Sequence, residues 1–74
     1  MTYRIPVNQC VALAKRKLMD SAYIRATQPK RADDADYVVG EAREYLCVAA
    51  EQGWSEDIDR FIADYLASPD CDFS

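Results

Sequence analysis

The sequence predicts an all-α fold, a small three-helix domain, and three observations support this prediction. The chain has 74 residues, half of them hydrophobic, which suits one domain with a thin core. Apolar residues recur at helical spacing in three segments, and proline or glycine separates these segments. Strand-like alternation is weak and confined to residues 2–5. We therefore expect one domain over residues 1–74, in which a long first helix packs across a hairpin of the second and third helices.

The first helix is predicted from about Val7 to Thr27. Pro6 suits its start because the first turn does not need the missing N–H, and Gln28-Pro29 ends it because a residue before proline avoids the α conformation. One apolar stripe contains Val7, Cys10, Val11, Ala14, Leu18 and Ala22. A second, weaker stripe on the other side contains Ala12, Met19, Tyr23 and Ala26. Two stripes predict contacts on two sides, so we expect the second stripe to form a homodimer interface.

The second helix is predicted to follow a polar connection at residues 28–33 and to begin at Asp33 or Asp34, since either carboxylate can cap it. Gly53 ends it because glycine readily adopts the left-handed conformation found after helices. Gly40 falls on the polar side, where glycine costs about 1 kcal/mol relative to alanine. The predicted apolar face contains Val38, Val39, Ala42, Tyr45, Leu46, Ala49 and Ala50.

The third helix has the most regular pattern. Its apolar residues are Ile58, Phe61, Ile62, Tyr65 and Leu66. Ser55 is the predicted cap, with Glu56 and Asp57 in the first turn, and Glu56 and Arg60 are spaced for an ion pair. Trp54, between the second and third helices, is expected to close one end of the core. Residues 1–6 are assigned to an N-terminal arm or short strand, and residues 69–74 to an acidic tail.

Charge divides the chain into two unlike halves. Residues 1–31 hold seven basic residues and one acid, and residues 32–74 hold two basic residues and twelve acids. Two interpretations stay open. One half could attract an oppositely charged partner, or the two halves could fold against each other and neutralise their charges.

Catalytic and metal-binding patterns are missing from the sequence. There is no histidine, and the three cysteines are too far apart for a paired-ligand motif. A three-helix domain of this size is expected to lack a cleft of even about 300 Å³. We expect no enzymatic activity, no cofactor and no metal. The longest apolar runs are too short to span a membrane, and the N-terminus has no apolar signal core, so a cytoplasmic location is expected.

The predicted partner surface is acidic. Its candidate residues on the second and third helices are Glu41, Glu44, Glu51, Asp57, Asp59, Asp64 and Tyr37. Such a surface can dock on a basic groove of another protein or imitate a phosphate backbone, and an exposed tyrosine is a good anchor. In size and charge the chain is similar to small acidic helical proteins of phages and mobile elements, which often inhibit host machinery. A regulator or inhibitor is therefore the first hypothesis.

Two other hypotheses are kept. The protein could be a homo-oligomerisation module that assembles through its first helix. It could also contact nucleic acid through the basic residues Lys15, Arg16, Lys17, Arg25, Lys30 and Arg31. Nucleic acid is not the expected partner, because consecutive helix residues point about 100° apart and do not form one stripe. The acids at the start of the third helix would also repel DNA from a helix-turn-helix docking.

Overall fold

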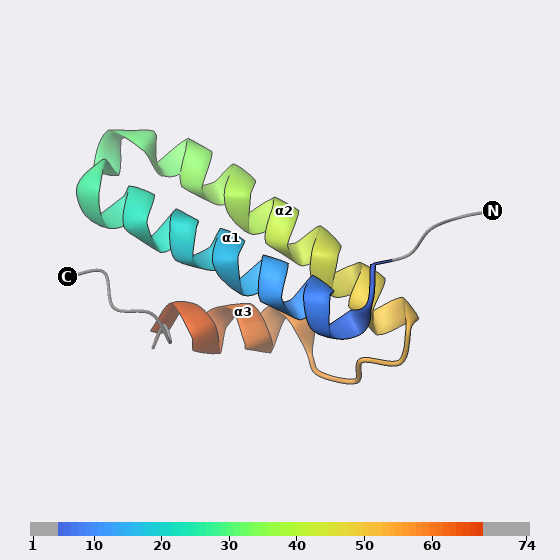
Figure 1. Ribbon diagram of the computed structural model, residues 1–74. Helices are drawn as coiled ribbons and strands as arrows, with labels where there is room; N and C mark the ends of the chain where they lie inside the picture. The colour runs from blue at the N-terminus through green and yellow to red at the C-terminus, as the bar shows by residue number, and fades with distance from the viewer. Residues whose placement is uncertain (1–4, 68–74) are drawn as a thin grey trace.

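Three α-helices and one short 3-10 turn make up residues 5–67, the part of the chain that this computed structural model describes (Figure 1). Helix α1 spans Val7–Thr27 and α2 spans Ala32–Glu51, with the turn η1 at Pro29–Arg31 between them; α3 spans Ile58–Ala67. The all-α, three-helix prediction is confirmed, and α1 has the predicted bounds. The predicted strand at the chain start, apart from Ile5, and the acidic tail lie outside the described residues.

Helices α1 and α2 form a tight antiparallel pair (Figure 1). The fully buried residues of this pair are Cys10, Ala14, Leu18 and Ser21 from α1 and Ala35, Ala42, Leu46 and Ala49 from α2. Most of these side chains are small, which lets the two backbones approach closely, and two leucines fill the space that remains. Ser21 satisfies its buried hydroxyl by donating to the carbonyl of Leu18 at 2.8 Å. The helix pair therefore has a thin core.

Helix α3 lies against one side of the α1–α2 pair, below α1 in Figure 1. It buries Ile62 and Tyr65. The predicted role of Trp54 is confirmed: its ring packs on the core and meets Phe61 edge-on, with ring centroids 5.3 Å apart. With ten residues, α3 is about 15 Å long, roughly half the length of α1 and α2. One side of the hairpin is thus only partly covered.

The predicted cap of α2 is wrong. The turn at Pro29–Arg31 leads directly into α2, and no side chain caps the helix. A capping residue needs an extended backbone, whereas the chain is already helical at Ala32, with φ −57° and ψ −32°. Asp33 and Asp34 instead lie in the first turn, where their charge suits the helix dipole.

The predicted cap of α3 is also wrong. Asp57, two residues after Ser55, accepts the N–H of Arg60 on its side-chain oxygen at 3.1 Å, and its carbonyl accepts the N–H of Phe61 at 2.8 Å. Arg60 pairs with Asp64 rather than with Glu56. At the end of α2 the prediction is confirmed, because Gly53 has a φ of +103°.

One predicted apolar assignment is wrong, and two buried positions were missed. Ala50, placed on the apolar face of α2, is exposed. Ser21 and Ala35 are fully buried although neither was assigned to an apolar stripe. Both are small enough to fit between closely spaced helices, and the hydrophobic pattern does not reveal such positions.

Candidate functional site: charged surfaces around the helix pair

The basic and acidic halves of the chain contact each other directly. Lys17 of α1 lies 3.7 Å from the carboxylate of Glu41 of α2, and Arg25 of α1 pairs with Asp36 of α2. Arg31 also binds Asp34 at 2.9 Å. The interpretation in which the two halves neutralise each other is therefore supported by the geometry.

Several predicted partner-binding acids already have contacts within the chain. Besides Glu41, Asp59 pairs with Arg43 of α2, and Asp64 lies 3.7 Å from Arg60. The carboxylate of Asp57 accepts a backbone N–H at the start of α3. A carboxylate that is held in an ion pair offers less field to a second protein. These acids are therefore weaker candidates than the sequence suggested.

The outer side of α2 keeps its negative charge. Asp33, Tyr37, Glu44 and Glu51 are all exposed, and their spacing of four, seven and seven residues places them within about 40° of one another around the helix. We call these four residues the α2 ridge. The only basic residue of α2, Arg43, points to α3 and Asp59. The ridge is therefore acidic along its whole length.

Tyr37 is the most exposed large hydrophobic residue of the ridge, with 72% of its surface accessible. Its predicted position on the polar side of α2 is confirmed. Gly40, one turn further along, has no heavy atom within 4 Å of the position where a Cβ would be. The surface of α2 at Gly40 is therefore open.

The basic residues of α1 do not form one surface. Lys15 lies in a groove beside α3, Lys17 binds Glu41, and Arg16 is exposed on a third side. This confirms the predicted divergence of the three side chains, which follows from the helical rotation of about 100° per residue. A protein that follows a phosphate backbone needs its cations in one stripe.

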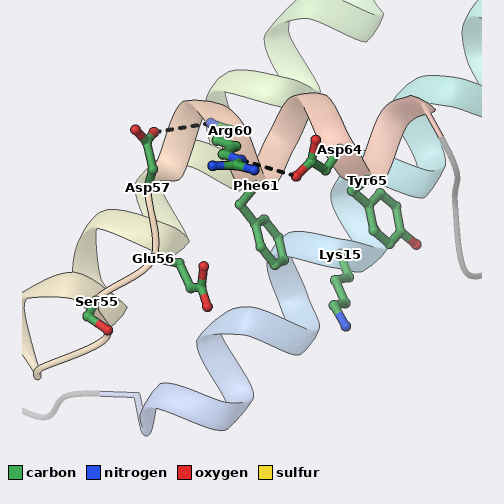
Figure 2. A pocket seen from close by; sticks show the side chains of 8 residues that line it. All are labelled: Lys15, Ser55, Glu56, Asp57, Arg60, Phe61, Asp64 and Tyr65. Carbon is green, nitrogen blue, oxygen red and sulfur yellow. Dashed lines mark hydrogen bonds and ion pairs between the residues drawn. The ribbon is translucent and has the colours of Figure 1, made fainter.

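A groove of about 500 Å³ lies between the start of α3 and α1 (Figure 2). The expectation that no cleft of this size would form is wrong, because the loop before α3 stands away from α1. Lys15, Phe61 and Tyr65 line one part of the groove, and Glu56 approaches from the loop. Its charged residues have both signs, and no group of three or more potential metal ligands is present among the described residues.

The second stripe of α1 is mostly at the surface. Ala12 and Ala26 are exposed, Tyr23 is 50% exposed, and Met19 is half-buried against the core. Contact of this stripe with a second copy stays a prediction. Met19, at least, already has a packing role within the chain.

None of the helices in residues 5–67 has the length and apolarity that a membrane crossing requires. Comparison with protein-family models, with curated proteins and with solved structures finds no match to this chain. The surfaces described above are therefore the basis for a functional proposal.

Proposed function

We propose that this protein is a non-catalytic binding module, a regulator or inhibitor that docks its α2 ridge on a basic surface of another protein. The observation that carries this proposal is the ridge itself: Asp33 and Glu44 are exposed on it together with Tyr37, whereas the acids Glu41, Asp59 and Asp64 are paired within the chain. A ridge of one sign on a rigid helix steers an oppositely charged partner and sets its orientation.

Tyr37 supplies the anchor of this surface. Tyrosine is enriched at interfaces because its ring buries a large area with little loss of conformational entropy. The acids around it would then contribute mainly to the association rate, and the tyrosine to the lifetime of the complex.

The proposal is tested by photo-crosslinking from the ridge. Tyr37 is replaced by p-benzoylphenylalanine, which keeps an aromatic ring at this site, and the labelled protein is irradiated in a lysate of its source cells. We expect a discrete adduct that disappears when salt screens the charges. The matched control carries the same probe at Tyr23, on α1, and should not give this adduct.

Two charge variants then separate the ridge from general acidity. Glu44→Lys, on the ridge, should weaken binding of the crosslinked partner at least tenfold, an effect of the size seen for reversed interface charges. Glu56→Lys makes the same change of charge at an exposed position in the loop before α3 and should change the affinity less than about twofold. Equal losses in both variants, or the same adduct from both probes, would contradict the proposal.

A further inference from the structure

The α1–α2 pair has a second apolar side, opposite α3. It is formed by the half-buried residues Leu13 and Ile24 of α1 and Val38, Tyr45 and Val48 of α2. We call this side the back face. Figure 1 shows α3 against one side of the helix pair only.

The contacts of α3 distinguish the side of the helix pair that faces α3 from the back face. On α1, Val11 packs on the core and Ala22 lies beside Leu66 of α3. Leu13 is turned about 160° from Val11 around the helix, and thus away from α3. On α2, Arg43 pairs with Asp59 of α3.

The same rotation orients the α2 residues of the back face. Tyr45 is turned about 160° from Arg43, and Val48 about 140°. Both therefore point away from α3. The back faces of α1 and α2 lie side by side, since the two helices are paired along their length.

The back face contains a hollow of about 220 Å³. Ile5, Tyr45 and Val48 form its apolar part, and Glu41 and Glu44 form an acidic edge. The side chain of Gln52 donates to the carbonyl of Ile5 at 2.6 Å and holds this wall in place. The hollow is therefore preformed for an apolar side chain that is accompanied by a cation.

On α1 of the same chain, Leu13 is such an apolar side chain and Arg16 is such a cation. Lys17 and Glu41 lie 3.7 Å apart. The middle of α1 is therefore level with the middle of α2 along the helix axis, and we call this position along the axis the height. In an antiparallel pair this places Leu13 at the height of Tyr45, and Arg16 between Glu41 and Glu44. A second copy can bring these α1 residues to the hollow without a shift along the helix axis.

We propose that two copies of this chain form a symmetric dimer through their back faces, with α1 of each copy lying along α2 of the other. A two-fold axis parallel to the helices keeps the heights equal, so Leu13 enters the partner's hollow and Arg16 meets the partner's Glu44. An axis across the helices would instead place α1 on α1 and the basic residues against each other. Charge therefore selects the first arrangement.

The available area suits a weak dimer. Two helices about 30 Å long and about 10 Å wide present a face of roughly 600 Å² per copy. The total of about 1,200 Å² is at the lower limit for specific interfaces. The four long helices would form a bundle in which neighbours are antiparallel. This interface is centred about 120° around α1 from its second stripe. It includes Glu44 of the α2 ridge and leaves Tyr37 accessible.

Sedimentation equilibrium at about 100 µM, a concentration suited to a micromolar dimer, tests the proposal. The wild type should have twice the 8.4 kDa mass of one chain. Leu13→Glu places a carboxylate against the acidic edge of the hollow and should raise the dissociation constant about a hundredfold. Ala12→Glu, the neighbouring exposed position, introduces the same charge on another side and should leave the dissociation constant within about twofold.

Arg16→Glu is a second test that does not depend on a half-buried residue, because Arg16 is exposed. Reversing its charge should weaken the dimer at least tenfold. Circular dichroism verifies that each variant is folded. A monomeric wild type, or a dimer that Ala12→Glu dissociates and Leu13→Glu does not, would overturn the proposal. The second result would assign the interface to the second stripe of α1 instead.

Cysteine crosslinking tests the arrangement of the helices. In a chain with Cys47→Ser and Cys71→Ser, one batch carries Leu13→Cys and a tagged second batch carries Val48→Cys. Oxidation of the mixture should join the two different chains, because α1 lies on the partner's α2. A disulfide formed only between two Leu13→Cys chains would show α1 on α1 and would overturn this arrangement.

Discussion

Asp57 shows how much one side chain decides at the residue scale. Ser55, Glu56 and Asp57 are three consecutive polar residues directly before α3. Only Asp57 accepts the backbone N–H of Arg60. Trp54 and Phe61, on either side of this loop, are in edge-on contact. The residue types alone do not favour Asp57 over Ser55, because both serine and aspartate are common caps.

The cap of α3 can be tested by truncating the side chains of Asp57 and Ser55 in turn. Asp57→Ala should lower the free energy of unfolding by about 1 kcal/mol, the usual value for a lost N-cap. Ser55→Ala makes a similar truncation at an exposed residue and should change it by less than about 0.5 kcal/mol. Urea denaturation followed by circular dichroism measures both. A larger loss of unfolding free energy in Ser55→Ala than in Asp57→Ala would show that Ser55 is the cap, as the sequence predicted.

At the scale of elements, α2 combines a buried side of small residues with an acidic outer side. Alanine and leucine face α1, and Gly40 interrupts the outer side next to the ridge. A glycine inside a helix is destabilising because it has more backbone freedom to lose. Nothing in the packing requires Gly40, since the space where a Cβ would lie is open.

Gly40→Ala should therefore raise the free energy of unfolding by about 1 kcal/mol. Gly53→Ala is the matched control: its φ of +103° disfavours any side chain, so this variant should be destabilised. Thermal and urea unfolding give the stability. If Gly40→Ala left the chain no more stable, the helix would have to be strained at this point.

At the scale of the whole molecule, opposite charges meet between the two halves of the chain. The pairs Lys17–Glu41 and Arg25–Asp36 both join α1 to α2. Each pair is partly exposed and therefore worth little alone. Their collective effect is to reduce the charge on the sides of α1 and α2 that face each other.

The Arg25–Asp36 pair tests this neutralisation. Arg25→Glu and Asp36→Arg should each lower the free energy of unfolding by up to about 1 kcal/mol, since each places like charges together. The double variant exchanges the two charges and should recover most of that loss. Urea is the suitable denaturant because it does not screen charges, and added salt should reduce all three effects. A double variant as unstable as the sum of the single ones would show that the pair is not coupled.

The amino-acid sequence by itself determined the three helices and most of their ends. Apolar periodicity, Pro29 and Gly53 act over a few residues, so their effects can be read locally. The exposure of Tyr37 and the divergence of Lys15 and Lys17 also follow from helical rotation alone. For the same reason the sequence indicated part of the α2 ridge, through Glu44 and Glu51.

Only the tertiary structure decided which acids remain available and which apolar sides remain uncovered. Glu41 and Asp59 lose their prominence because their cations come from other helices. The back face exists because α3 is short and packs on one side of the helix pair. These properties depend on the relative placement of segments far apart in the chain, and the energy that selects this placement comes from packing in the core rather than from any local pattern.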